Sequence, residues 1–300
     1  MEHDAVIVEV GLNEVVTPAV HPHVAQTPQD CAADSRRCAT AGAAVVHWHA
    51  VDAAGIQRLG DADLYGAALD AMNGCILAYP SYPTDVPDTV RDRLAHCLEL
   101  RRRHGLEIAP LDVATVNVVL WDAEAKVLAP LTPVPGFDVI RNSLPFVADA
   151  LSRYRDVGLF PTVATFDVGS TRTVAALAGA GLLAQPVLLK IFLWGSPAIG
   201  PEPSVEALDL HLRQLPSHLD VEWIVVPYGI ADPALVESLA RAALERGGGV
   251  RVGIGDNPTA FPDVANAALV ERVGRWAADA GRPLAGADQL RARIGSSRHS

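Results

Sequence analysis

The chain has 300 residues, 50% of them hydrophobic and 20% charged, so it can bury a large core and is not expected to be disordered. Its formal net charge of −11 disfavours contact with phosphate backbones, so nucleic acid is not an expected partner. The first residues lack the basic region of a signal peptide and no apolar run is long enough to span a bilayer, which predicts a soluble cytoplasmic protein without a membrane partner.

Short, mostly apolar runs alternate with longer amphipathic segments along the whole chain, as in parallel strands that are covered on both faces. The predicted strands are Ala5–Val10, Ala44–His49, Cys75–Tyr79, Val113–Asn117, Thr162–Phe166, Val187–Leu193, Val221–Val226 and Val250–Gly253. The first predicted helix begins at the capping sequence Thr27-Pro28-Gln29-Asp30 and ends near Gly42. The other predicted helices are Asp61–Met72, Pro87–His104, Asp138–Arg155, Ser170–Leu182, Val205–Leu215, Asp232–Arg246 and Asp263–Ala280.

A strand that is followed by a helix, repeated in this way, is typical of the (β/α)₈ barrel, and the chain length suits one such domain. A doubly wound open sheet would need a glycine-rich phosphate-binding turn after an early strand, and the sequence has none there. We therefore predict an α/β protein with a single catalytic domain, a (β/α)₈ TIM barrel, over residues 1–300. An irregular insertion is expected over Val119–Gly136, after the fourth predicted strand.

In this fold the active site lies at the carboxyl ends of the strands, so the polar residues predicted there are the site candidates. His47 and His49 are two residues apart on a strand and therefore point to the same face. Two imidazoles on the inward face can bind one metal ion, and imidazole suits zinc, which catalytic sites usually hold with three protein ligands. The alternative is two unrelated polar side chains at the barrel rim. An H-x-H pair also marks amidohydrolase barrels, but there it lies on the first strand and later strands add histidines, which the later predicted strands here lack.

Other polar residues in or beside the predicted strands have two interpretations each. Glu9 lies inside the first predicted strand, where it is either a metal-site residue or part of a buried ion pair. Arg251 lies in the last strand and is expected to pair with a carboxylate, and Asp256 just beyond is either that partner or a general base. Thr115 and Asn117 end the fourth predicted strand, where they are either site residues or partners for strand-end backbone groups.

Several segments resemble the β-keto acid cleavage enzymes, whose named member is 3-keto-5-aminohexanoate cleavage enzyme. The matching segments are Thr27-Pro28, Ala41 to His49 (AGAAVVHWH), Ala114 to Asn117 (ATVN), Gly248 to Asn257 (GGVRVGIGDN) and Ala278 to Ile294. They follow in order along nearly the whole chain, and the histidine segment together with the segment around Arg251 is quite specific.

The resemblance implies a zinc-dependent (β/α)₈ barrel, commonly a tetramer, so we expect a homo-oligomer. It implies a reaction that condenses a β-keto acid with acetyl-CoA and gives acetoacetate and a new acyl-CoA. By the same resemblance, His47 and His49 match zinc-binding histidines, Asp256 matches the residue that removes a substrate proton, and Arg251, Glu14 and Thr115 match other active-site positions. We expect Ser81, Asn117 and Tyr228, which follow or end strands, to bind substrate.

The chain departs from the family at Gly255, where the family has a zinc-binding glutamate just before the aspartate. We expect Glu9, Glu14 or water to complete the metal shell. The segment Tyr79 to Pro83 also departs, because the family tends to have serine or threonine there, and either Ser81 or Thr84 is a replacement. Two other functions stay open: a different metal-dependent carbon–carbon lyase or hydrolase on the same barrel, and a binding protein without metal.

Overall fold

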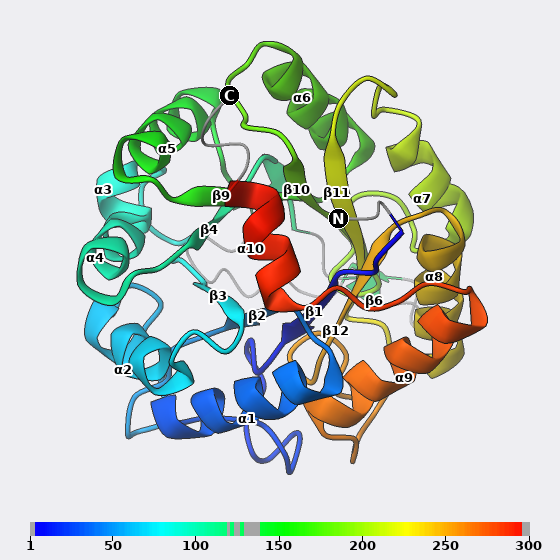
Figure 1. Ribbon diagram of the computed structural model, residues 1–300, viewed down its shortest axis with the longest axis horizontal. Coiled ribbons are helices and arrows are strands. Elements are labelled where there is room, and N and C mark those ends of the chain that lie inside the picture. The colour runs from blue at the N-terminus through cyan, green and yellow to red at the C-terminus, as the bar shows by residue number, and fades with distance from the viewer. Residues whose placement is uncertain (1–3, 119–120, 123–126, 129–138, 296–300) are drawn as a thin grey trace.

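The computed structural model describes residues 4–118, 121–122, 127–128 and 139–295, and its helices form a ring around a central parallel sheet (Figure 1). The sheet has eight strands in the order β3-β2-β1-β12-β11-β10-β9-β4. Their bounds are β1 (Val8–Gly11), β2 (Val45–Trp48), β3 (Leu77–Pro80), β4 (Ile108–Asp112), β9 (Phe160–Thr165), β10 (Val187–Trp194), β11 (Val221–Tyr228) and β12 (Gly249–Val252). The end strands β3 and β4 also lie against each other, so the sheet curls into a nearly closed barrel. The predicted (β/α)₈ barrel is therefore confirmed.

The helices lie mostly where the amphipathic segments predicted them. They are α1 (Pro28–Ala41), α2 (Ala62–Met72), α3 (Val90–Arg93), α4 (Ala95–His104), α5 (Leu144–Val157), α6 (Val168–Gly179), α7 (Val205–Leu212), α8 (Pro233–Glu245), α9 (Asn266–Asp279) and α10 (Ala287–Gly295). The predicted capping box is present at α1, where Thr27 and Asp30 each accept a hydrogen bond from the other's backbone N–H, and Gly42 ends the helix in the left-handed conformation. The predicted third helix is divided into α3 and α4 at Leu94.

The prediction for the fourth strand is wrong by five residues. The barrel strand is Ile108–Asp112, whereas Val116–Asn117 forms the short strand β5, which pairs antiparallel with β8 (Val139–Ile140). The true strand contains Pro110, which lowers its strand propensity and led the prediction to the following β-branched run. Proline is tolerated here because β4 is hydrogen-bonded only to β9, so its other edge needs no backbone donor.

The predicted insertion at Val119–Gly136 lies mostly outside the described residues. Its described parts are β6 (Trp121–Asp122) and β7 (Val127–Leu128), which pair antiparallel. No helix in the described ranges is long and apolar enough to cross a membrane.

The amino-terminal end of the barrel is closed by α10, which lies across the centre of the view in Figure 1. Leu290 and Ile294 of this helix pack with the inward-facing apolar residues of the lowest barrel layer, among them Ile7 and Ile108. Arg293 adds an ion pair with Glu222 at 3.0 Å. This packing fills the amino-terminal end of the barrel, opposite the end where the strands finish.

Candidate metal centre and active site

A cavity of about 250 Å³ opens at the carboxyl end of the barrel. Of the residues predicted for the site, Glu14, His47, His49, Ser81, Tyr228 and Arg251 line it. The lining residues come from strands at both ends of the strand order and from strands in its middle. The curling of the sheet therefore brings together segments that are far apart in the sequence.

Glu14, His47 and His49 meet on one side of this cavity. His47 lies within β2 and His49 directly follows it, so their rings project from the same face, with centroids 5.5 Å apart. The Nε2 atom of His47 lies 3.1 Å from one Glu14 oxygen, and that of His49 lies 2.6 Å from the other. All three side chains are buried, and their ligand atoms lie within 4.8 Å of one another. This is the one group of potential metal ligands in the described part of the chain.

The hydrogen bonds at Nδ1 of the two histidines determine which nitrogen of each ring carries a hydrogen. His47 Nδ1 lies 3.2 Å from the Tyr79 carbonyl oxygen, and His49 Nδ1 lies 3.1 Å from Gln57 Oε1. Both oxygens only accept, so each Nδ1 is the donor, and a ring that carries no second proton turns an Nε2 lone pair towards Glu14. Such a lone pair and a carboxylate need a cation between them, either a proton or a metal ion. The donor set therefore fits a divalent metal with two imidazoles and one carboxylate, which is a common catalytic zinc set.

The position of Glu14 depends on contacts with its neighbours and on the absence of a side chain at Gly255. Its backbone has φ 40°, the left-handed region that costs free energy for any residue except glycine. The Asn13 side chain beside it donates to the His49 carbonyl at 2.9 Å and accepts from the His49 N–H at 2.8 Å. A Cβ atom at Gly255 would lie 2.6 Å from Glu14 Cγ and 2.9 Å from Glu14 N. The glycine that cannot bind metal therefore makes room for a glutamate that can.

Arg251 connects Glu14 to Asp256. Its Nε atom lies 3.1 Å from each Asp256 carboxylate oxygen, and its Nη2 atom also contacts Glu14. Burial alone would raise the pKa of the Glu14 carboxyl, but His49, His47 and Arg251 together hold it well below its usual range. Burial raises the pKa of Asp256 to about 6, although Arg251 opposes the shift. Asp256 is thus a buried carboxylate of unusually high basicity.

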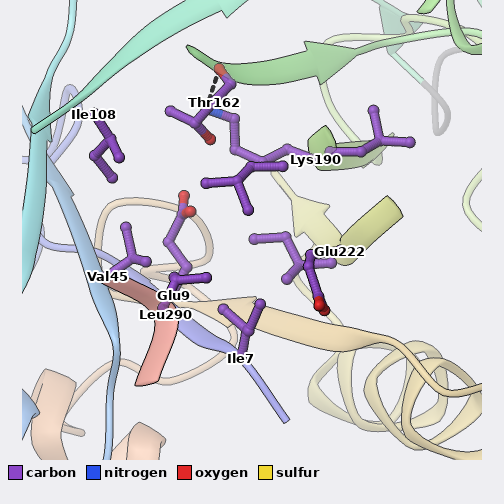
Figure 2. Close-up of a pocket in the computed structure, with 11 residues that line it drawn as sticks. Ile7, Glu9, Val45, Ile108, Thr162, Lys190, Glu222 and Leu290 are labelled. Atoms are coloured by element: carbon purple, nitrogen blue, oxygen red, sulfur yellow. Dashed lines mark hydrogen bonds between the residues drawn. The ribbon is translucent and has the colours of Figure 1, made fainter. Parts of the chain in front are cut away.

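Glu9 lies outside the metal-ligand group. Its carboxylate accepts from Arg251 Nη1 at 3.2 Å and from the Tyr79 hydroxyl, so its described contacts are those of the buried ion pair that the sequence left open. Below these residues, a cavity of about 20 Å³ is lined by the polar side chains of Glu9, Thr162, Lys190 and Glu222 and by apolar side chains (Figure 2). That volume is enough for about one water molecule.

Lys190 was missed as a site residue, although a lysine inside an apolar strand is a visible signal. It projects from β10, and its Nζ atom donates to the Tyr79 hydroxyl at 3.0 Å and lies 4.1 Å from the centre of the Tyr79 ring. Burial lowers the pKa of Lys190 to about 8. Tyr79, Lys190 and Arg251 form the floor of the large cavity, and all three are buried.

Across the cavity from Glu14, His47 and His49 lies an aromatic wall, which we define as Phe166, Phe192, Trp194 and Tyr228. The rings project from the ends of three neighbouring strands, and Trp194 and Tyr228 have centroids 4.3 Å apart. Of these four residues only Tyr228 was predicted for the site. The signal for Phe192 and Trp194 was their spacing with Lys190, which places alternate residues of β10 on the inward face.

Across residues 5–295 the sequence matches the family described as beta-keto acid cleavage enzyme. The chain belongs to this family. It is 26% identical to the 3-dehydrocarnitine:acetyl-CoA trimethylamine transferase of Rhizobium meliloti (strain 1021), over 91% of this chain and 90% of that protein. The resemblance found from the sequence is therefore confirmed, and the chain is a β-keto acid cleavage enzyme.

Solved structures of low sequence identity share the barrel. One is ObcA in a ternary complex with a C4-CoA adduct and oxalate, with a TM-score of 0.62, 19% identity, and coverage of 91% of this chain and 68% of that chain. Another is a truncated 3-deoxy-D-arabino-heptulosonate 7-phosphate synthase from Thermotoga maritima, with a TM-score of 0.51, 11% identity, and coverage of 94% and 90%. These likenesses show the fold of the β-keto acid cleavage enzyme and nothing more.

Four residues predicted for the active site of this cleavage enzyme do not line the cavity: Glu9, Asp256, Thr115 and Asn117. Glu9 and Asp256 are buried and both pair with Arg251. Thr115 and Asn117 are exposed, because the fourth barrel strand ends at Asp112 and not at Asn117. The Thr115 hydroxyl accepts from the Asn142 N–H at 3.0 Å. Asp112 takes the inward position at the end of this strand and lines the cavity. The roles predicted for Thr115 and Asn117 stay predictions, now without support from their position.

Proposed function

We propose that this enzyme condenses a β-keto acid with acetyl-CoA and releases acetoacetate and a new acyl-CoA, with zinc held by Glu14, His47 and His49. The observation that carries the proposal is the placement of these three ligands and Arg251 at one cavity, with the buried Asp256 paired to Arg251. The name of the Rhizobium meliloti relative gives acetyl-CoA as the co-substrate of that protein, which supports the same co-substrate here.

The chain's own residues can perform the proton transfers of this reaction. The metal, when bound, supplies a Lewis acid that polarises the substrate ketone and so acidifies the neighbouring carbon. Asp256 accepts the proton from that carbon, because its raised pKa makes it a stronger base than an ordinary aspartate while leaving it ionised at neutral pH. Arg251 orients the Asp256 carboxylate through both of its oxygens.

The bonds of the overall reaction balance without a further reactant. The α-carbon of the keto acid forms a bond to the acetyl carbonyl carbon, and the acetyl thioester bond breaks to release the CoA thiolate. The thiolate then attacks the original ketone carbon, and the carbon–carbon bond between that carbon and the α-carbon breaks. The products are the acyl-CoA and acetoacetate, whose α-carbon regains the proton.

The test is an assay of the zinc-loaded protein with a panel of β-keto acids, with and without acetyl-CoA, followed by mass spectrometry of the products. We expect acetoacetate and one new acyl-CoA in equal amounts, only when acetyl-CoA is present. Cleavage that is independent of acetyl-CoA would instead identify another metal-dependent lyase or hydrolase on this barrel. Binding without any product would identify a binding protein.

We also propose that the enzyme is a homo-oligomer, with a tetramer as the first arrangement to test. Val15 and Ile56, in the loops that follow β1 and β2, are 65% and 52% exposed, which supports an apolar contact near the cavity mouth. Light scattering of the purified protein measures its mass directly, and the mass of one chain would overturn this proposal.

A further inference from the structure

Lysine is almost absent from this chain, yet one lysine lies at the large cavity. Of the 24 lysines and arginines in the sequence, only Lys126 and Lys190 are lysines. Lys190 lines the same cavity as Glu14, His47 and His49. Arginine keeps its positive charge permanently, whereas lysine can lose a proton and become a nucleophile. The side chain at position 190 can therefore perform a reaction that the arginines of this chain cannot.

The hydrogen-bond partners of the Lys190 Nζ atom are both acceptors. Nζ donates to the Tyr79 hydroxyl oxygen at 3.0 Å and to the Thr162 carbonyl oxygen at 3.4 Å, and Figure 2 shows the second of these bonds. The Tyr79 hydroxyl donates its own hydrogen to Glu9, so it accepts from Lys190. A neutral amine has two hydrogens and one lone pair, and these two acceptors engage both hydrogens. The lone pair is then left without a partner among the described residues.

The surroundings of Lys190 favour the neutral amine. The side chain is buried, and no described carboxylate forms an ion pair with it. Burial lowers the pKa of Lys190 to about 8, and the positive charge of Arg251 adds to this shift. The carboxylates of Glu9, Asp112 and Glu14 act in the opposite direction but do not cancel it. A lysine that is withdrawn from water beside another cation is suited to attack a carbonyl carbon and form a Schiff base.

We propose that Lys190 gives this enzyme a second activity, the decarboxylation of β-keto acids through an imine (a Schiff base) between Nζ and the substrate ketone. The chain belongs to a family that cleaves β-keto acids, and Lys190 lies on the floor of the cavity in which we place the keto acid. The second activity goes beyond the proposed condensation, and it needs neither a metal ion nor acetyl-CoA.

The bonds of this second reaction balance without an oxidant or a reductant. The Nζ lone pair forms a bond to the ketone carbon, and the ketone oxygen leaves as water with one hydrogen from the amine and one proton from the surroundings. The nitrogen of the protonated imine then takes up the electron pair of the bond between the α-carbon and the carboxylate, so carbon dioxide leaves and an enamine remains. The α-carbon of the enamine gains a proton, and water hydrolyses the resulting imine to a ketone and free Lys190. The net reaction consumes one proton and one β-keto acid.

Reductive trapping with acetoacetate, a simple β-keto acid, tests the proposal. The purified full-length protein is incubated with saturating acetoacetate at pH 8 without acetyl-CoA, and cyanoborohydride reduces any imine to a stable amine that mass spectrometry of the peptides locates. We expect the adduct on Lys190 and not on Lys126, with or without a chelator, and acetone released faster than in buffer alone. An unmodified Lys190 would overturn the proposal. An adduct on Lys190 without additional acetone would overturn the decarboxylation.

Two conservative variants separate the chemistry of Lys190 from a structural role. Lys190→Arg keeps the positive charge and the N–H donors but cannot form an imine, so the adduct and the additional acetone should both be lost. Lys126→Arg is the matched control and should keep both. Additional acetone at the wild-type rate from a folded Lys190→Arg protein would overturn the role of Lys190. Trapping in the wild-type protein needs no variant, so poor folding of Lys190→Arg leaves the main test intact.

The pH dependence of acetone release is a second readout. Because the pKa of Lys190 is lowered to about 8, its neutral fraction should rise about tenfold from pH 6 to pH 7 and only about twofold from pH 8 to pH 9. The additional acetone should follow this curve. A rate that still rises about tenfold from pH 8 to pH 9 would indicate an ordinary lysine and overturn the proposal. No acetyl-CoA is present in these assays, so their failure and the failure of the proposed condensation are separate results.

Discussion

The two walls of the cavity differ in how completely their polar atoms are paired. On the metal side, Glu14, His47 and His49 each have a partner behind them, from Arg251, the Tyr79 carbonyl and Gln57. On the opposite side, rings contact rings, and the Trp194 Nε1 atom is buried with no hydrogen-bond partner among the described residues.

The difference separates two tasks within one cavity. Bond-making chemistry needs ligand atoms and bases that are fixed before the substrate arrives, because reorganisation during the reaction would add to the barrier. Binding a side group needs shape, exclusion of water and a charge of the right sign. The following changes test this division, from the largest expected effect to the smallest.

The largest effect is expected from Asp256→Asn. The change keeps the shape of the side chain but removes the base, so kcat should fall by about a hundredfold to ten-thousandfold. Steady-state assays with the best keto acid measure this loss, and elemental analysis should show unchanged zinc because Asp256 lies outside the ligand group. Activity within a few-fold of the wild type would remove Asp256 from the mechanism.

Gly255→Glu tests the steric link between this position and Glu14. The new Cβ atom would lie 2.6 Å from Glu14 Cγ, so Glu14 must move and zinc affinity should fall by about tenfold to a hundredfold. Competition with a chelator of known affinity measures the zinc dissociation constant. The double change Glu14→Gly with Gly255→Glu should recover part of the zinc affinity, because it removes the steric conflict and supplies a carboxylate from position 255 instead of position 14. Unchanged affinity in the single variant would contradict the account.

The pH dependence of the reaction tests whether Asp256 is the base. Burial raises the pKa of Asp256 to about 6, and the base is active only when it has lost its proton. The value of kcat/KM should therefore fall about tenfold per pH unit below pH 6 and level off above it. Zinc content measured across the same range controls for loss of metal in acid. A rate that stays constant down to pH 5 would show that Asp256 is not the titrating base.

The smallest effect is expected on the aromatic wall. Trp194→Leu keeps an apolar surface but removes one ring face, so KM for the preferred keto acid should rise by about threefold to tenfold while kcat changes little. Zinc content should equal that of the wild type. A large loss of kcat without a change in KM would mean that this wall takes part in the chemistry and that the division between the walls is wrong.

The sequence predicted the parts of this molecule that follow a repeating pattern. The alternation of apolar strands and amphipathic helices gave the barrel, and the two-residue spacing of His47 and His49 placed both rings on one face. Glu14 could only be one of several candidates, because its direction depends on a left-handed backbone and on the space at Gly255.

Other parts of the site depend on contacts that no local pattern reveals. Asp112 was missed because Pro110 shifted the predicted fourth strand, which moved the inward positions to Thr115 and Asn117. Only Tyr228 of the aromatic wall was predicted, because the four rings come from three strands and become neighbours only when the sheet curls. Register and side-chain direction, which depend on tertiary packing, are what the sequence did not reveal.

The central claim is that Glu14, His47 and His49 hold the catalytic metal. Elemental analysis of the purified protein, beside Glu14→Ala, His47→Ala and the control Glu9→Gln, tests it most directly. We predict about one zinc per chain in the wild type and in Glu9→Gln, whose carboxylate position pairs with Arg251, and little or none in the other two variants. Full zinc content in Glu14→Ala, or zinc lost only in Glu9→Gln, would contradict the account.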